Sequence, residues 1–449
     1  MYSSVIDSKV FGCLFSTEAM RRVFSDENLV QKWLDTEAAL ATAQAELGII
    51  PKGEADEIVA KAKADLLDIS SIGEFYKSSI TIVPLLKAFG KVLDGKAGEY
   101  VHWGATSQDI VDTGLILQIK DACAILRARL IALEKACYAQ AKAHRNLVMA
   151  GRTHVQHALP VTMGFKVAVW ASEITRHIIR LDECQERLFI GQLSGAVGTL
   201  ASMEDKGLEV QKRMMNILGL KAPDIAWHTA RDHIAEFVGL LALVAASVSK
   251  IAHEVLTLQR TEIGELEEPF FMGKVGSSTM PHKRNPQVCE NVIALTRSVR
   301  ALAPLAVEAM ICENERDWSC ELAEWDFVGR ACIMSDAALE KTVDIVTNLI
   351  VHPDKMERNL DCLKGLMLSE SVMMHLGDKL GRMTAHDIIY ATCMSAFEKG
   401  ESMLNALLAD SRVTKHFTEQ ELKGMLDPHK YVGLAPEFVD RVLAKQPHR

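Results

Sequence analysis

The stretch "GKVGSSTMPHKRNP", residues 273–286, lies between two long segments with helical hydrophobic spacing. Gly and Pro break helices, and this stretch contains both, together with hydroxyl side chains and several cations. We therefore predict a polar loop that joins two long helices. A loop of this composition in a helical protein needs an explanation beyond connection, because its charges have no opposite charges nearby in sequence.

Helical periodicity is strongest before this loop. From Asp232 onward, apolar residues recur at steps of three and four: Ile234, Phe237, Leu241, Val244, Val248, Ile251, Val255 and Leu258. Similar stripes occupy 115–137, 167–188, 288–302 and 333–349, the second of them with Pro160 expected near its first turn. Such lengths indicate a bundle of long helices. Segments such as "GLLALVAASV" are apolar on more than one side, which favours a homo-oligomer.

The regions on either side of these stripes hold shorter helical patterns. One of them covers 29–47 and ends at Gly48 and Pro51. No strand-rich segment, internal repeat or low-complexity tract is evident. We predict an all-α fold of three helical domains in a row, with boundaries at 1–110, 111–360 and 361–449.

Composition excludes several classes of function. The chain has 449 residues and a formal net charge of −9 without a basic block, which argues against a nucleic-acid-binding protein. Its start lacks the pattern of a secretory signal, and no uninterrupted apolar run suggests a membrane span. The ten cysteines form no C-x-x-C pair, so we expect reduced thiols in a cytoplasmic protein.

Three polar islands carry the candidate chemistry: 100–109, 151–162 and 273–286. Each is expected to precede a helix, and helix N-termini attract anions. Together they offer polar side chains for a carboxylate pocket: Thr106, Ser107, Thr153, Lys283 and Asn285.

Each island also has a structural interpretation. Thr106 and Ser107 are equally well explained as helix caps, and His102 as a hydrogen-bonded structural histidine. His154 and His157 could share a helix face and bind a metal, but no third ligand pattern accompanies them. We expect neither a metal nor a cofactor.

The segment "GSSTMPHKRNP" resembles the signature of the fumarase/aspartase superfamily, and "HWGATSQD" and "GRTHVQHALP" are similar to its two other signature regions. The resemblance extends over nearly the whole chain. It implies a homotetramer built on a shared helical bundle, with active sites that draw residues from three subunits. It also implies an enzyme that removes a proton next to a carboxylate and expels a group from the neighbouring carbon, or catalyses the reverse addition.

The resemblance assigns roles residue by residue. Ser277 would be the general base, His154 the general acid and Glu290 its partner. A hydroxyl is a weak base, so it requires backbone donors and a nearby cation to stabilise its alkoxide. The expected substrate-binding residues are His102, Thr106, Ser107, Thr153, Gln156, Ser278, Met280, Lys283 and Asn285.

Two branches of the superfamily are candidates for the reaction of this chain, and we expect a small di- or tricarboxylate as the substrate. "EYVHWGATSQDIVDTGLILQ" most resembles the 3-carboxy-cis,cis-muconate cycloisomerases of aromatic-acid breakdown, which we take as the first hypothesis. "AQAELGIIPK" and Glu290 favour the adenylosuccinate lyases or a related lyase that releases fumarate from a succinyl compound. A non-catalytic structural role is the remaining alternative, and the intact Ser277, Lys283 and His154 argue against it.

Overall fold

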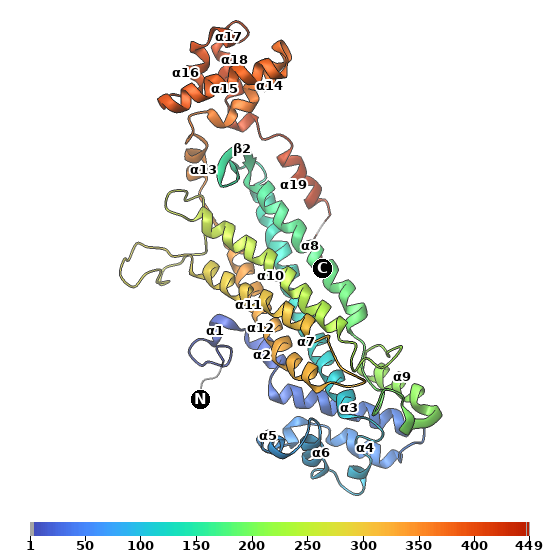
Figure 1. Cartoon of the computed structure of the whole chain (residues 1–449). Coiled ribbons are helices and arrows are strands. Elements are labelled where there is room, and N and C mark those ends of the chain that lie inside the picture. Colours follow the sequence, from blue (N-terminus) through green and yellow to red (C-terminus); the bar gives the residue numbers. More distant parts are fainter. Residues whose placement is uncertain (1–3, 446, 449) are drawn as a thin grey trace. The chain divides into compact units, whose positions relative to one another are not determined.

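The computed structural model describes residues 4–445, 447 and 448 of the chain. Helices make up 67% of it and strands 4%, so the predicted all-α fold is confirmed. The five longest helices are α7 (Ser107–Ala143), α8 (Met163–Leu188), α10 (Asp232–Leu258), α11 (Gln287–Glu308) and α12 (Trp318–Thr347) (Figure 1). They coincide with the five predicted stripes, although α12 begins well before Ile333.

The remaining helices are shorter. The N-terminal part contains α1 (Gly12–Phe15), α2 (Glu18–Val23), α3 (Asp26–Glu46), α4 (Lys52–Lys61), α5 (Ile69–Phe75) and α6 (Val83–Gly90). Between the long helices lies α9 (Gly207–Leu218). The C-terminal part contains α13 (Pro353–Leu360), α14 (Ser369–Leu380), α15 (Arg382–Lys399), α16 (Met403–Ala409), α17 (Ser411–Thr414), α18 (Glu419–Met425) and α19 (Ala435–Leu443).

The chain divides into two compact units that do not follow chain order. Unit 1 comprises Met1–Leu130, His177–Ser249 and Asn291–Glu340, and unit 2 comprises Ile131–Arg176, Lys250–Glu290 and Lys341–Arg449. Each of the five long helices therefore contributes one portion to each unit. This division leaves the three expected domain boundaries as a prediction.

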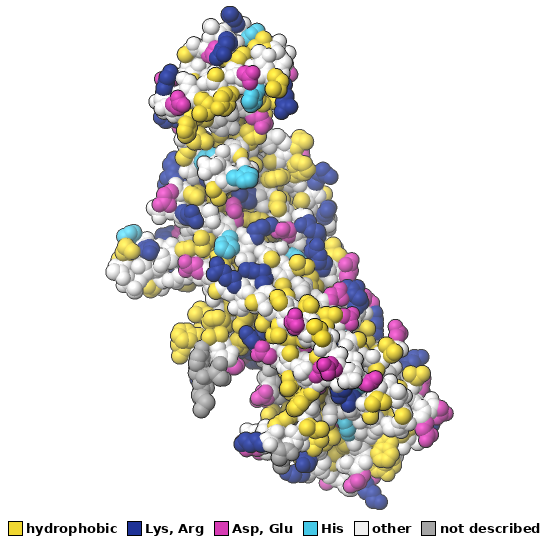
Figure 2. Space-filling model, viewed as in Figure 1, with side chains coloured by type: hydrophobic (Ala, Val, Ile, Leu, Met, Phe, Trp, Pro, Cys, Tyr) yellow, Lys and Arg dark blue, Asp and Glu magenta, His cyan; other side chains and the backbone are white. Residues whose placement is uncertain are grey.

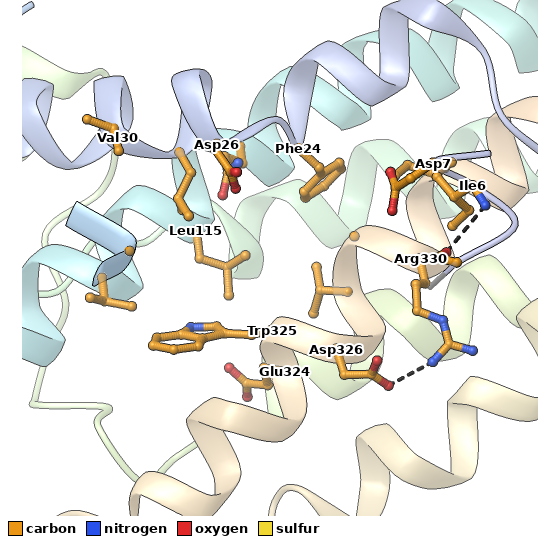
Figure 3. Close-up of a pocket in the computed structure, with 18 of the residues that line it drawn as sticks. Ile6, Asp7, Phe24, Asp26, Val30, Leu115, Glu324, Trp325, Asp326 and Arg330 are labelled. Atoms are coloured by element: carbon orange, nitrogen blue, oxygen red, sulfur yellow. Dashed lines mark hydrogen bonds and ion pairs between the residues drawn. The ribbon is translucent and has the colours of Figure 1, made fainter. Parts of the chain in front are cut away.

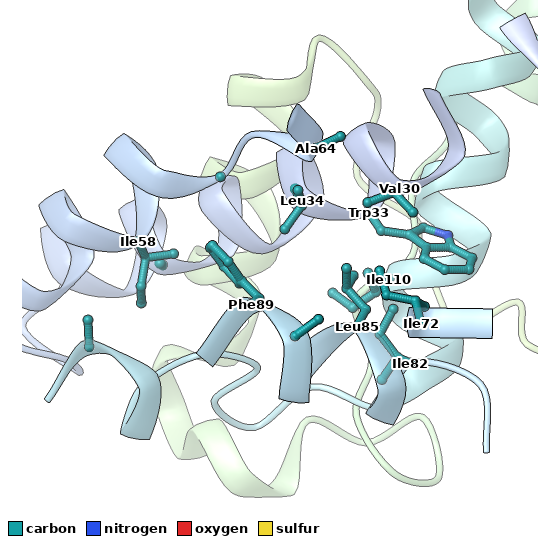
Figure 4. Packing of buried hydrophobic residues seen from close by; sticks show 14 of the residues in the cluster. Val30, Trp33, Leu34, Ile58, Ala64, Ile72, Ile82, Leu85, Phe89 and Ile110 are labelled. Atoms are coloured by element: carbon teal, nitrogen blue, oxygen red, sulfur yellow. The ribbon is translucent and has the colours of Figure 1, made fainter. Parts of the chain in front are cut away.

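A hydrophobic core in unit 1 joins the N-terminal helices. Trp33 and Leu34 of α3 pack with Ile58 of α4 and Phe89 of α6, all of them buried (Figure 4). The contact of α3 with α7 is so close that a Cβ at Gly114 would lie 2.6 Å from Cδ1 of Trp33. Only glycine fits at this crossing.

The C-terminal helices of unit 2 have a core of their own. Leu376 of α14, Ile389 of α15, Leu407 of α16 and Leu422 of α18 belong to one cluster of buried residues, and Figure 1 shows these helices close together. Thr418 and Glu421 form a reciprocal capping box at the start of α18. This part of unit 2 therefore packs around apolar side chains that the sequence supplies locally.

A β-hairpin in unit 2 corrects the sequence prediction. β1 (Val148–Thr153) pairs antiparallel with β2 (Gln156–Thr162), where no strand was expected. Pro160 lies opposite Ala150 in this hairpin, and α8 begins only at Met163, so the placement of Pro160 in a helical first turn was wrong. A second, two-residue pairing joins β3 (Leu266–Glu267) to β4 (Ile350–Val351).

Helix α10 is long and apolar enough to cross a membrane by length and composition alone. Most of its most apolar window is buried inside the structure, as in the core helix of a soluble protein. The burial of α10 is therefore consistent with the expectation, made from the sequence, that the chain has no membrane span.

A buried ionic cluster lies in unit 1. Arg231 donates to both carboxylate oxygens of Asp112, at 2.8 and 2.9 Å, and pairs with Glu324. The neighbouring Glu321 is also buried, and its Oε1 has no hydrogen-bond partner among the described residues. Burial, followed by the negative charge of Asp112, raises the pKa of Glu321 to about 8, although Arg231 opposes the shift.

The Glu321 carboxyl generates a prediction about stability. Because its pKa is higher in the folded than in the unfolded state, the folded state keeps a proton that the unfolded state has lost between about pH 4.5 and 8. This difference costs stability increasingly as the pH rises through that window. Glu321→Gln should therefore stabilise the protein more at pH 8 than at pH 5, measured by urea unfolding.

The exposed Glu308, also in unit 1, provides the matched control. Glu308→Gln should leave the free energy of unfolding unchanged relative to wild type at both pH values. An equal effect of Glu321→Gln at pH 5 and pH 8 would show that this carboxyl is not held protonated.

Candidate active site

The loop at 273–286 connects the segment after β3 to the start of α11, within unit 2. It extends away from the adjoining helices as a projection in Figures 1 and 2. Its two limbs approach so closely that a Cβ at Gly276 would lie 2.3 Å from the carbonyl oxygen of Lys283. This glycine is therefore required by the loop's own shape.

Ser277 occupies the turn of this loop. Its Oγ accepts hydrogen bonds from the backbone N–H groups of Thr279, at 3.3 Å, and Met280, at 3.1 Å. Backbone donors aimed at a hydroxyl oxygen favour its negatively charged form. The neighbouring Ser278 instead contacts the hydroxyl of Thr279 at 3.5 Å, so the two serines have different surroundings.

Lys283 and Asn285 follow in the second limb of the loop. Lys283 is exposed and Asn285 half-buried. Among the described residues, no carboxylate forms an ion pair with the Lys283 ammonium, whereas Lys274 and Arg284 in the same loop are both paired. Lys283 is thus a cation that remains available to an anionic ligand.

His154 lies at the tip of the β-hairpin. His154 and Val155 are its two turn residues, with φ of 51° and 61°, between the paired Thr153 and Gln156. Such turns normally use Asn-Gly, because positive φ is strained for other residues and most of all for a β-branched one. Strain of this kind is often found at functional sites.

The hairpin excludes a metal site formed by His154 and His157 on a shared helix face. His154 and His157 do not share a helix face, since both lie on the hairpin. Burial, together with the positive charge of Arg152, lowers the pKa of His157. No group of three metal-binding side chains occurs in residues 4–445, 447 and 448.

Glu290 is in the first turn of α11 and is exposed. An acidic residue there is favoured by the helix dipole. Within the described part of the chain, no hydrogen bond joins Glu290 to His154. Their cooperation stays a prediction.

The remaining polar island, residues 100–109, contains His102 and lies in unit 1. The Nδ1 atom of His102 is 2.7 Å from Oε1 of the buried Glu37, and its backbone N–H donates to Oε2 of the same carboxylate. Burial lowers the pKa of His102, but the charge and hydrogen bond of Glu37 outweigh this and raise it overall. The structural interpretation of His102 therefore has direct support.

Asp109 organises the same island. It is fully buried, and its carboxylate accepts the N–H groups of Thr106, Ser194 and Gly195 and contacts His228 at 2.9 Å. Ser107 begins α7. Thr106 is the residue before α7, and the Asp109 side chain accepts its backbone N–H. This hydrogen bond supports the interpretation of Thr106 as part of a helix cap.

The twelve predicted site residues divide between the units. His102, Thr106 and Ser107 lie in unit 1. The others belong to unit 2, some on the hairpin and some on the loop or the start of α11: Thr153, His154, Gln156, Ser277, Ser278, Met280, Lys283, Asn285 and Glu290. Their roles remain predictions, and the structure adds the hairpin and the loop as the two elements that carry them.

A cavity of about 970 Å³ lies elsewhere, and all the residues that line it belong to unit 1 (Figure 3). Phe24, Asp26 and Trp325 line it, and its Arg330 is paired with Asp326 at 2.8 Å. None of the predicted site residues lines this cavity. Carboxylates such as Asp26 and Glu324 also line this cavity, and its arginine is already paired, so it does not suit a polycarboxylate. We therefore place the candidate site at the loop and the hairpin.

Three buried carboxylates that precede the loop in sequence were not among the predicted site residues. Glu265, Glu267 and Glu268 are all buried, and each pairs with a cation of the hairpin or loop. The signal was present, because "GELEEP", residues 264–269, ends only three residues before the cationic loop, so the expectation that the loop's charges have no opposite charges nearby in sequence was wrong.

Comparison with known proteins bears on the chemistry. The protein family described as "Lyase" matches residues 15–301, and "Adenylosuccinate lyase C-terminus" matches residues 365–442. The chain is 40% identical to N-acetyl-S-(2-succino)cysteine lyase of Dickeya dadantii, over 99% of this chain and 98% of the relative. The chain belongs to the fumarase/aspartase superfamily of lyases.

Other superfamily members are equally similar. Adenylosuccinate lyase of Methanocaldococcus jannaschii is 42% identical over 96% of this chain and 94% of its own. The crystal structure of 3-carboxy-cis,cis-muconate lactonizing enzyme from Pseudomonas putida superposes with a TM-score of 0.92, at 36% identity, covering 98% of this chain and 99% of that one. The enzyme class is thereby established, while these three relatives are named for three different substrates.

The strained hairpin turn can be tested. Val155 is 88% exposed, so Val155→Gly removes little packing while relieving a positive φ that costs about 1–3 kcal/mol. We expect Val155→Gly to raise the free energy of unfolding, measured by urea denaturation.

Val197 is the matched control, because it is an exposed loop valine without positive φ. Val197→Gly should destabilise slightly through the added backbone freedom of the unfolded chain. Equal destabilisation by both substitutions would contradict the proposed strain.

Proposed function

We propose that this lyase eliminates fumarate from a small succinyl compound, and that N-acetyl-S-(2-succino)cysteine is the first substrate to test. Ser277 removes a proton from the CH2 group next to a carboxylate. The electron pair of that C–H bond forms the new double bond, and the C–S bond to the neighbouring carbon breaks. His154 gives a proton to the departing thiolate, so that fumarate and a free thiol result.

The observation that carries this proposal is the setting of Ser277. Two backbone N–H groups point at its Oγ, and Lys283, which has no ion-pair partner among the described residues, lies in the same loop, whose close approach requires Gly276. This combination supports an alkoxide and also a substrate carboxylate that gains negative charge as the proton leaves. Asn285 supplies a further polar group for that carboxylate.

Glu290 and the pair Leu14–Phe15 bear on the identity of the leaving group. Glu290 departs from the muconate cycloisomerases, many of which carry a small residue there, and its carboxylate suits a general acid that must protonate a leaving group. Leu14 and Phe15 lie at α1, where adenylosuccinate lyases typically carry an Arg-Tyr pair. An apolar pair offers no charge-assisted contact to a nucleotide phosphate. A small succinyl compound satisfies both positions.

A second candidate is cycloisomerisation of 3-carboxy-cis,cis-muconate, our first hypothesis from sequence. The similarity to the Pseudomonas putida enzyme over nearly the whole of both chains favours it. The same base and carboxylate clamp would serve this reaction. In either case, we propose a cytoplasmic homotetramer whose active sites are shared between subunits.

The substrate proposal is tested with a panel. Purified enzyme is given N-acetyl-S-(2-succino)cysteine, adenylosuccinate and 3-carboxy-cis,cis-muconate in parallel, and kcat/KM is compared for each. We expect the succinyl thioether to give the highest value and adenylosuccinate the lowest. Efficient turnover of the muconate alone would replace the elimination proposal with the second candidate.

The base is tested with the paired serines of the loop. Ser277→Ala should lower kcat by roughly a factor of 100 or more, because it removes the proton acceptor. Ser278→Ala, one residue away, should retain more activity, since its hydroxyl lacks the two backbone donors. A larger loss in Ser278→Ala than in Ser277→Ala would move the base to the second serine.

A further inference from the structure

The segment between α10 and the loop carries three buried carboxylates. Glu265, Glu267 and Glu268 are 0%, 8% and 1% exposed, and Leu266–Glu267 forms the short strand β3. A buried carboxylate is costly unless it is paired and hydrogen-bonded. The partners of each carboxylate therefore show what this segment holds in place.

Glu265 holds the hairpin that carries His154. Arg152 of β1 donates to both of its oxygens, at 2.8 and 2.7 Å, in a bidentate pair. Asn359 donates to Oε1 of the same carboxylate at 2.7 Å. Because Arg152 is only two residues before His154, this anchor fixes the strand that leads directly into the strained turn.

Glu268 holds both ends of the loop that carries Ser277. Its Oε1 accepts from the Lys274 ammonium at 2.8 Å, near the start of the loop. Its Oε2 accepts the N–H groups of Val288 and Cys289 at 3.0 and 2.9 Å, at the start of α11. A carboxylate at a helix N-terminus is further favoured by the helix dipole.

Glu267 adds a third attachment. It pairs with Arg284 at 3.0 Å, while the Arg284 guanidinium lies 4.5 Å from the centre of the Phe270 ring. Gln259, at the end of α10, donates to the Arg284 carbonyl and accepts the Glu268 N–H. The exposed loop is thus tied to buried groups on both of its limbs.

We propose that Glu265 and Glu268 are positioning residues for the two halves of the reaction: Glu265 orients the acid-bearing hairpin through Arg152, and Glu268 orients the base-bearing loop through Lys274 and α11. Neither carboxylate transfers a proton or touches the substrate. The inference rests on the proposed function, which assigns acid and base to these elements. It holds whether the hairpin and loop of one chain serve the same pocket or, in a shared-site tetramer, different ones.

The two anchors should produce different kinetic defects. With Glu268→Gln, proton removal is impaired, so kcat should fall roughly 10- to 100-fold for every substrate, the range expected for loss of a charge-assisted hydrogen bond. The primary isotope effect for substrate deuterated at the CH2 group should rise. With Glu265→Gln, protonation of the leaving group is impaired, so the loss should grow as the leaving group becomes more basic.

The experiment uses a series of succinyl thioethers and succinyl amines, with and without deuterium at the CH2 group. Glu262→Gln is the matched control, because Glu262 lies in the same segment but is exposed. It should match wild type in kcat, KM and isotope effect. If both buried variants lose the same factor on all substrates with an unchanged isotope effect, their role is structural only and the proposal is overturned.

A second measurement does not depend on activity. In hydrogen–deuterium exchange, Glu268→Gln should speed exchange of amides in 269–289, and Glu265→Gln should speed exchange in 148–162. Lys274→Met tests the loop anchor from its other side, with both acidic residues intact, and should also speed exchange in 269–289. Unchanged exchange in Lys274→Met and Glu268→Gln would overturn the anchor itself.

The kinetic and exchange measurements distinguish a failure of the proposed function from a failure of the anchors. Inactivity of the wild type on every succinyl compound would overturn the proposed function while leaving the exchange result to judge the anchors. Segment-specific exchange without the predicted isotope and leaving-group patterns would keep the anchors and overturn their assignment to acid and base.

Discussion

The pairing of the buried Glu268 with Lys274 and the N-terminus of α11 is the contact on which the candidate site depends. The loop carries the proposed base Ser277 and a lysine with no ion-pair partner among the described residues, and it buries none of its apolar side chains. Its shape must therefore come from polar contacts, and buried carboxylates give the strongest available ones. Lys274 is paired with Glu268 and Arg284 with Glu267, whereas Lys283 has no ion-pair partner among the described residues and is available to an anionic ligand.

The hairpin, like the loop, depends on polar contacts for its shape. A two-residue turn made of His and Val is strained, so it persists only where the flanking strands over-determine it. The Arg152–Glu265 pair and the β1–β2 ladder supply that constraint. The strained turn that presents His154 lowers the stability of the fold, as does the burial of Glu321, which raises the pKa of that carboxyl.

Much of the fold could be predicted from sequence, because local periodicity specifies long helices. The stripe from Asp232 to Leu258 coincides with α10, and the signature loop was identified residue by residue. The hairpin was missed since its turn lacks the usual Asn-Gly, and the His154–His157 spacing suggested a helix instead. The hairpin anchor could not be predicted, because Arg152 and Glu265, like Arg231 and Asp112, are far apart in the chain and only the fold brings them together. The loop anchor between Glu268 and Lys274 joins residues close in sequence, so its signal was present there.

If the loop at 273–286 is the catalytic element, a crystal structure of Ser277→Ala with a bound succinyl thioether should show it. We expect a substrate carboxylate in contact with the Lys283 ammonium and the Asn285 amide. The Cβ of residue 277 should face the CH2 group whose proton is removed. A substrate bound away from this loop, for instance in the cavity lined by Phe24 and Trp325, would show that the loop is not the catalytic element.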